Sequence, residues 1–132
     1  MEISREERGV VLSIGDNVLF DTGSAALKKS AGQAIAAVAD SLVKLPNKVV
    51  IEGHTDNVPV SEHRKPYTSN WDLSRTRATQ VLSYLLQTFG LPPERFSAAG
   101  YAEYRPKATN ATPEGRAKNR RVDIIILTRN GK

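Results

Sequence analysis

The sequence has 132 residues, no cysteine and a formal net charge of +5 at pH 7. This length is typical of one domain, which closes a single hydrophobic core without disulfides or metals. The lack of cysteine excludes a disulfide framework, a thiolate metal site and a cysteine nucleophile. No window approaches the roughly 18 apolar residues of a membrane-spanning helix. If the protein works outside the cytoplasm, we expect an export signal or a membrane anchor upstream of this sequence.

The positive charge is concentrated near the C-terminus. The segment Arg105–Arg121 holds six basic residues and one acidic residue, which accounts for the whole net charge. Such a basic patch attracts polyanions, so a nucleic-acid-binding domain is one alternative. Only Tyr101 and Tyr104 lie beside it for base stacking, and a solvated basic face is the simpler interpretation.

The N-terminal third is expected to hold a linker, a strand pair and a helix. Residues 1–8 are charged and lack an apolar pattern, so we assign them to a linker. Residues 9–14 and 18–20 are apolar and predict two strands, or one bent strand, around the turn signal at residues 15–17. Residues 25–45 repeat apolar side chains at helical spacing and predict a helix.

The middle of the chain predicts a strand, a long loop and a second helix. Residues 48–52 are rich in β-branched side chains and indicate a buried strand, with the stretch GHTD at its carboxyl end. Residues 57–69 contain two prolines and no period, so they predict a long loop, and such loops tend to be functional. Residues 71–89 carry the strongest helical period, with Asn70 or Asp72 as the N-cap.

The C-terminal third predicts a strand at residues 96–101 and a final buried strand at residues 122–127. Between them, Thr112 as the N-cap and Pro113 as the first helical residue predict a short helix to about Lys118. Residues 129–132 are expected to be a tail. The order βαβαβαβ over residues 9–128 predicts one α+β or α/β domain of two layers, with helices packed on one sheet.

The stretch EGHTD, residues 52–56, places one histidine and two carboxylates within five residues. A zinc site needs three or four ligands. Two of the four candidate ligands, Glu62 and His63, lie in the predicted loop, so no metal is expected. Glu52 and Asp56 are a poor acid–base pair because strand alternation separates them. Ser61 and His63 lack a third orienting group, so no enzyme is expected. The candidate metal ligands are His54, Asp56, Glu62 and His63.

A clamp for a charged ligand is the remaining interpretation of this stretch. Arg77 precedes the apolar stripe of the second helix. Its side chain can therefore point toward the strand end that carries Asp56. Together the two residues suit a zwitterion, because Asp56 accepts from an ammonium and Arg77 holds a carboxylate through two parallel hydrogen bonds. The spacing equally allows Asp56 and Arg77 to form a structural salt bridge with each other.

Five motifs in register resemble the OmpA-like peptidoglycan-binding domain over nearly the whole chain. The insert that begins NVP and the patterns SNWDLSRTRA and EGRAKNRRVDI look most like the MotB branch of that family, the flagellar motor stator B subunits. The resemblance implies an α+β domain of two layers, with helices on one face of a mixed β-sheet. The five motifs are FDTGSAAL (20–27), VVIEGHTD (49–56), NWDLSRTRA (70–78), GLPPERFSAAGYAEYRP (90–106) and NRRVDIIIL (119–127).

The same resemblance implies non-catalytic binding of peptidoglycan, without a cofactor, through the meso-diaminopimelate of the stem peptide. The side chain of that amino acid ends in its own ammonium and carboxylate. Asp56 matches the aspartate that takes the ammonium, and Arg77 matches the arginine that takes the carboxylate. His54 is expected to be a structural hydrogen-bonding residue beneath the loop.

Further positions are carried over by the same motifs. Thr55 and Asn70 fall where residues line or brace the pocket. Arg120 and Arg121 match a pair of which one arginine faces the ligand or glycan and the other is structural. Gly23 departs from relatives that place an asparagine nearby, so only its backbone can contact a ligand.

The MotB resemblance also implies partners and a location. It predicts a periplasmic domain of a protein anchored in the bacterial inner membrane, a MotA-like stator A subunit reached through a membrane segment absent here, and a homodimer. Nucleic acid is not expected as a partner. The alternatives are a wall anchor of an outer-membrane protein or lipoprotein, a nucleic-acid-binding domain and a metal-dependent hydrolase.

Overall fold

The computed structural model describes residues 1–60 and 67–128, which form one mixed β-sheet with helices against it. The strands lie in the order β1-β2-β5-β3-β4, and only the β3–β4 pair is parallel. The predicted α+β fold with a mixed sheet is confirmed. The strands are β1 (Glu2–Arg5), β2 (Gly9–Gly15), β3 (Val49–His54), β4 (Phe96–Gly100) and β5 (Arg121–Leu127).

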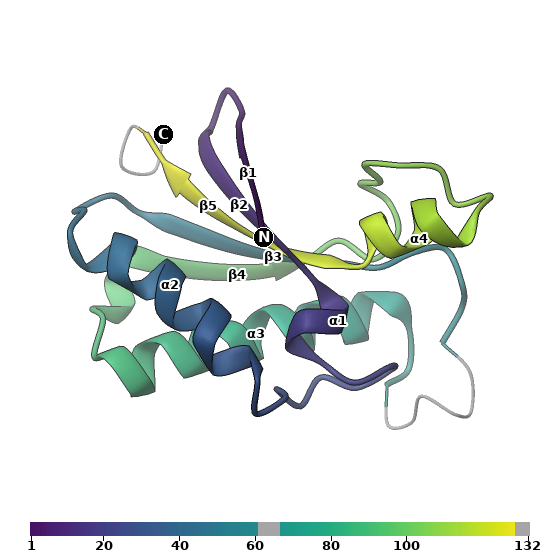
Figure 1. The fold of residues 1–132 in the computed structure, drawn as a ribbon, viewed down its shortest axis with the longest axis horizontal. Coiled ribbons are helices and arrows are strands. Elements are labelled where there is room, and N and C mark those ends of the chain that lie inside the picture. Colours follow the sequence, from purple (N-terminus) through teal and green to yellow (C-terminus); the bar gives the residue numbers. More distant parts are fainter. Residues whose placement is uncertain (61–66, 129–132) are drawn as a thin grey trace.

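The two long helices run along one face of the sheet, and α4 lies beyond its end (Figure 1). None of the helices in the described residues is both long and apolar enough to cross a membrane. The helices are α1 (Asp16–Leu19), α2 (Ala31–Val43), α3 (Asn70–Phe89), α4 (Pro113–Asn119) and the short 3-10 helix η2 (Pro93–Arg95).

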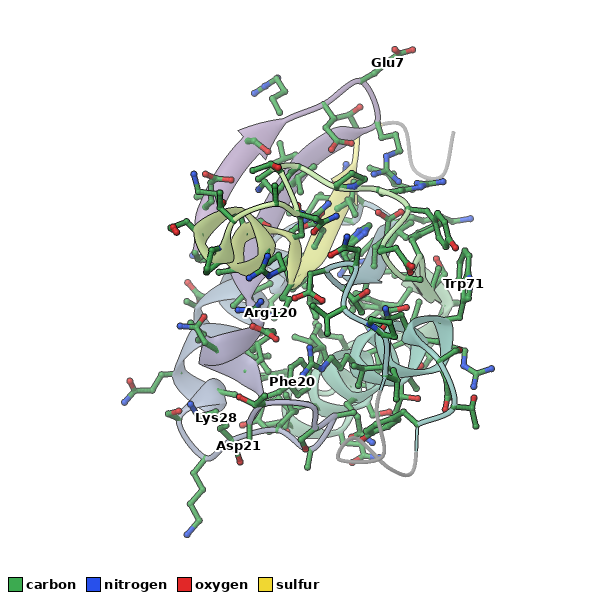
Figure 2. All side chains as sticks on the ribbon, turned by 90° about the vertical axis from the view of Figure 1, so that its right-hand side faces the viewer. Glu7, Phe20, Asp21, Lys28, Trp71 and Arg120 are labelled. Atoms are coloured by element: carbon green, nitrogen blue, oxygen red, sulfur yellow. The ribbon has the colours of Figure 1, made fainter. Side chains whose placement is uncertain are left out.

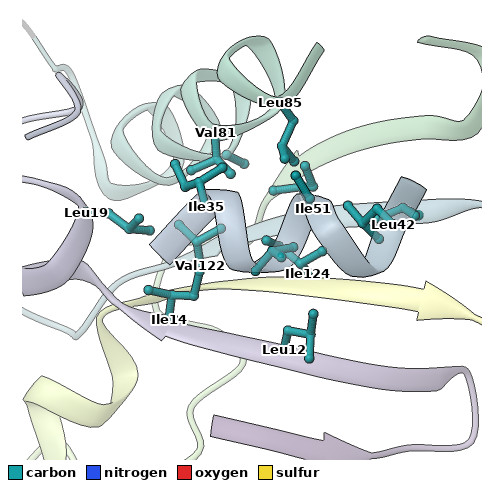
Figure 3. Packing of buried hydrophobic residues seen from close by; sticks show 14 of the residues in the cluster. Leu12, Ile14, Leu19, Ile35, Leu42, Ile51, Val81, Leu85, Val122 and Ile124 are labelled. Atoms are coloured by element: carbon teal, nitrogen blue, oxygen red, sulfur yellow. The ribbon is translucent and has the colours of Figure 1, made fainter. Parts of the chain in front are cut away.

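The hydrophobic core fills the space between this sheet face and α2 and α3 (Figure 3). Alternate residues of a strand point to the same face, so Val122 and Ile124 of β5 enter the core while Arg121 and Asp123 point to the opposite face. Burial of such side chains contributes about 1.5–3 kcal/mol each. Core residues from five elements include Leu12, Ile14, Ile35, Leu42, Ile51, Val81, Leu85, Val122 and Ile124.

Helix α3 follows its prediction except at the cap. The N-cap is Ser69, whose hydroxyl accepts from the N–H of Asp72 at 3.1 Å. The prediction of Asn70 or Asp72 as the cap is therefore wrong. Asn70 instead donates to the carbonyl oxygen of Val58 at 3.1 Å, so it ties the start of the helix to the segment after β3.

Three predictions in the N-terminal third are wrong. Residues 1–8 are not a linker alone, because β1 pairs with β2 at the sheet edge. Residues 16–19 form a helical turn, so Val18 and Leu19 are helical instead of part of the predicted strand at residues 18–20. Helix α2 begins at Ala31 rather than near residue 25. The intervening segment stays extended enough for Phe20 to form an isolated bridge with Leu27. This leaves a loop between α1 and α2 that borders the candidate site.

Candidate ligand-binding site

A cavity of about 390 Å³ opens where the carboxyl end of β3 meets α1 and the first half of α3. Figure 2 looks toward this side of the molecule, with Arg120, Phe20 and Lys28 near one another. Four segments far apart in sequence line it, so the cavity exists only in the folded chain. Its lining residues are Asp16, Asn17, Phe20, Asp21, Thr22, Gly23, Lys28, Thr55, Asp56, Leu73, Arg77 and Arg120.

Asp56 is held rigidly although it lies beyond the last residue of β3. Its side chain is nearly fully buried, Oδ1 accepts from the N–H of Val58 at 3.1 Å, and Oδ2 accepts from Arg120 Nη1 at 2.9 Å. The preceding Thr55 donates its N–H to the carbonyl of Ala102 at 2.9 Å, which continues the sheet-like pairing past the strand end. The carboxylate therefore has a fixed position at the cavity wall.

Arg77 occupies a second wall of the cavity. It is 3% exposed, its Nη1 donates to Asp16 Oδ2 at 3.0 Å, and its Nε donates to the carbonyl of Ser24 at 2.8 Å. Its guanidinium carbon lies 4.8 Å from the centre of the Phe20 ring, a cation–π contact. These contacts fix the plane of the guanidinium between α3 and the loop after α1.

The charges in the cavity alternate in sign. Arg120 reaches both carboxylates, with Nη1 at 2.9 Å from Asp56 Oδ2 and Nε at 3.5 Å from Asp16 Oδ2. The order is therefore Asp56, Arg120, Asp16 and Arg77. Asp56 pairs with Arg120 and Arg77 pairs with Asp16, so Asp56 and Arg77 do not form a salt bridge with each other. Such an alternating array is neutral as a whole and complements a ligand that carries both signs of charge.

The structure separates the predicted site residues into two groups. Asp56, Arg77, Thr55 and Arg120 line the cavity. Asn70 lies behind it as a brace. Arg121 is not brought to the cavity.

Arg121 points to the opposite face of the sheet. Its Nε donates to Asp123 Oδ2 at 3.1 Å, and its other nitrogens donate to the carbonyls of Asn119 and Arg105. Of the arginine pair, Arg120 thus lines the cavity and Arg121 is structural.

Several cavity residues were missed by reasoning from the sequence, among them an aspartate, a phenylalanine and a lysine. Asp16 stands in what looked like a turn, Phe20 in what looked like a strand, and Lys28 in what looked like a helix. Asp16 lies 61 residues from its partner Arg77, so no local spacing reveals the pair. The adjacent FDTGSAAL motif was the available signal.

His54 lies on the opposite face of the sheet from the cavity, buried beside Glu52 and Asp123. Its Nε2 is 3.5 Å from Glu52 Oε1 and 3.7 Å from Asp123 Oδ2, and its ring stacks on Tyr101 with centres 5.6 Å apart. Neither ring nitrogen has a hydrogen-bond partner among the described residues. The ring lies away from the cavity, as a structural role requires, and it packs on Tyr101 without the hydrogen bond that was expected.

Glu52, His54 and Asp123 place three potential metal ligands within 4.8 Å of one another. Both carboxylates already have arginine partners, since Arg8 Nη1 lies 2.7 Å from Glu52 and Arg121 Nε lies 3.1 Å from Asp123. A divalent cation would therefore meet two fixed positive charges, which argues against a metal here.

The other sequence candidates for chemistry do not assemble in the described residues. Glu52 and Asp56 belong to opposite sides of the sheet, so they are not an acid–base pair. Ser61, Glu62 and His63 lie outside the described residues.

Burial of the Glu52 carboxyl tends to raise its pKa, but His54 and the hydrogen bond and charge of Arg8 outweigh burial and lower the pKa to about 2. Glu52 is therefore ionised in the folded protein at every physiological pH. The network on this face is a closed structural array.

Comparisons with known proteins match this chain to a family and to named relatives. The model of the OmpA family matches residues 19–120. The chain is similar to Motility protein B of Bacillus subtilis, with 38% identity over 98% of this chain and 49% of the relative. It spans about half the length of the curated relatives that it matches first.

Two solved structures share the fold over almost the whole chain. The cell wall anchor of the T6SS from Pseudomonas aeruginosa superimposes with a TM-score of 0.85 at 36% identity, covering 96% of this chain and 86% of the other. The periplasmic domain of Helicobacter pylori MotB superimposes with a TM-score of 0.87 at 29% identity, covering 96% and 81%.

Proposed function

The chain belongs to the OmpA family, and from that premise we propose that it binds peptidoglycan without catalysis, through the diaminopimelate of the stem peptide. The observation that carries the proposal is the alternating array of Asp56, Arg120, Asp16 and Arg77 in one solvent-accessible cavity. A neutral array with separated charges favours a neutral ligand with separated charges.

The two ends of the array have different tasks. The carboxylate of Asp56 has several lone pairs, so it accepts from the ligand's ammonium while it keeps its bonds to Val58 and Arg120. The guanidinium of Arg77 has five N–H donors in one plane, which suits it to a carboxylate. Thr55 and Gly23 complete the wall, and Gly23, with φ of 69°, contributes backbone only.

Binding at one such site is expected to be modest. Each charge-assisted hydrogen bond contributes about 1.5–3 kcal/mol net, and two or three of them give affinities in the micromolar to millimolar range. The wall is a polymer, so a homodimer gains avidity through effective concentration. This suits an anchor whose holding strength comes from several weak contacts.

The relatives extend the proposal to the whole protein. Similarity to Motility protein B and to MotB periplasmic domains supports a role as the wall anchor of a flagellar motor stator. The domain would then lie in the periplasm as part of a homodimer anchored in the inner membrane, with a MotA-like A subunit as partner. The T6SS wall anchor supports the same wall-binding role in another assembly.

Sedimentation with insoluble diaminopimelate-type peptidoglycan tests the proposal. The parent is expected to sediment, and Asp56→Asn is expected to stay in solution. Because Arg77 is buried, Arg77→Lys keeps the charge but loses the planar fork, and it is also expected to stay in solution. Asp40→Asn and Arg5→Ala change exposed residues of the same types and serve as controls. Circular dichroism checks that each variant is folded.

Two results would contradict the proposal. A parent that stays in solution does not bind the wall. If instead the folded Asp56 and Arg77 variants sediment as well as the parent, and salt releases all of them together, the basic patch at Arg105–Arg121 retains the wall without the cavity.

A further inference from the structure

Two aromatic side chains are exposed together at the start of α3. Trp71, the only tryptophan of the chain, is 51% exposed in the first turn of α3, and Tyr104, in the loop after β4, is 65% exposed. Their rings stack with centres 5.3 Å apart and planes at 22°. Large aromatic rings contribute most to binding when they become buried, so this pair, here called the aromatic platform, marks a surface that gains from being covered.

The rim of the platform is polar and carries both signs of charge. Asp72 and Arg75 form an ion pair at 2.8 Å in the groove on one side of Trp71. Glu103 lies in the groove on the other side, together with Tyr104. Among the described residues that line these two grooves, the charged ones are two carboxylates and one guanidinium, a mixed set that does not favour a polyanion such as nucleic acid.

A sugar ring matches this combination of groups. One face of a pyranose presents C–H bonds, whose slight positive charge is attracted to the negative face of an aromatic ring. Its edge presents hydroxyl and acetamido groups, which need the donors and acceptors that Asp72, Arg75 and Glu103 offer. A purely apolar partner would leave these charged groups desolvated at a cost.

The platform is continuous with the proposed clamp. Asn70, next to Trp71, donates to the carbonyl oxygen of Asp56 at 3.4 Å. Trp71 and Arg77 are six residues apart on α3, which is about 9 Å along the helix axis. Three residues of extended peptide span about 10 Å, and diaminopimelate is the third residue of a peptide attached to a glycan sugar. The length of such a peptide is therefore comparable with the axial distance between Arg77 and Trp71.

We propose that Trp71 and Tyr104 form a saccharide-binding platform that takes a glycan sugar of the peptidoglycan whose diaminopimelate occupies the cavity. The sugar's identity rests on the proposed function, whereas the sugar-binding property of the platform stands on the aromatic pair and its rim. The two parts are therefore tested separately.

Tryptophan fluorescence gives a direct assay, because Trp71 is the only tryptophan. The probe is a soluble N-acetylglucosamine tetramer, which has no peptide. We expect a saturable change of fluorescence in the parent and an equal change in Asp56→Asn. Tyr104→Ala is expected to weaken binding about 3- to 10-fold, the range for loss of one aromatic pair. Tyr104→Phe keeps the ring and is expected to bind like the parent.

Several outcomes would overturn the inference. The first is an absence of saturable change with the tetramer, and the second is a Tyr104→Ala variant that binds it like the parent. A fluorescence shift with protein concentration alone, without sugar, would instead assign the platform to contact between two copies. If the parent sediments with peptidoglycan in any of these cases, the proposed function stands and only the platform fails. If the tetramer binds but Asp56→Asn sediments like the parent, the clamp fails and the platform stands.

Discussion

Replacing Glu52 by glutamine tests the ion network behind the site. The pKa of Glu52 falls from an ordinary 4.5 to about 2 in the folded protein. A shift of this size corresponds to about 3 kcal/mol of stability at pH 7. This is an upper value, because 39% of the partner side chain of Arg8 is exposed and screened by solvent.

The lowered pKa fixes the direction of the pH dependence. A carboxylate with a depressed folded-state pKa contributes its full stability above about pH 4.5, and the contribution is lost as the pH falls toward 2. Between pH 7 and pH 3 the loss amounts to about 2 kcal/mol. The gap in unfolding free energy between the parent and Glu52→Gln is therefore expected to narrow by that amount.

Urea unfolding followed by circular dichroism at pH 7, 5 and 3 measures this gap. Asp40→Asn serves as the control, because the Asp40 side chain is 77% exposed and its pair with Lys44 is at 3.7 Å. The difference in unfolding free energy between Asp40→Asn and the parent is expected to stay near zero at each pH. If the difference in unfolding free energy between the parent and Glu52→Gln is the same at pH 7 and pH 3, the strongly lowered pKa of Glu52 is refuted.

Variants at three further positions test the local arguments. Ser69→Ala removes the N-cap of α3 and should cost about 1 kcal/mol in urea unfolding, whereas Ser69→Gly should cost only a few tenths; equal costs would contradict the cap. Gly53→Ala places a Cβ against the carbonyl oxygen of Ser74, so β3 and α3 must separate, and unfolding should become easier by about 1–3 kcal/mol or more. Arg120→Ala leaves the buried carboxylate of Asp56 without its guanidinium and should weaken wall sedimentation about tenfold; unchanged sedimentation would exclude Arg120 from the site.

Elements with a strong local signal could be predicted from the sequence. Helix α3 was placed to within one residue because its apolar period extends over about three turns, from Ala78 to Phe89, and Gly90 ends it in the left-handed conformation. Thr112 was correctly placed as the N-cap of α4, where its hydroxyl accepts from the N–H of Gly115. In both cases the residues that decide the element lie within a few positions of it.

Elements that depend on distant contacts could not be predicted. All four residues of β1 are exposed, so no alternation marks them, and the strand exists because β2 offers an edge. Helix α1 has only four residues, fewer than the period needs, and its apolar Val18 and Leu19 resemble a strand. The cavity residue Asp16 shares this difficulty, since its role follows from α1 turning toward Arg77.

One part of the site held a signal that could have been used. In β5 the apolar Val122 and Ile124 point to the core, so Arg121 must point to the other face with Asp123. Arg120 then falls on the side of the helices, where the cavity lies. Strand alternation alone was sufficient to separate the cavity arginine from the structural one.

The two sides of β3 carry similar charged residues but differ in what they can bind. On the far side the buried carboxylates of Glu52 and Asp123 are paired with Arg8 and Arg121, although 39% of the Arg8 side chain is exposed. On the near side Arg120 keeps 32% of its side chain exposed and lies beside a cavity. The charged groups of the near side line a cavity, so we expect a ligand to bind on that side.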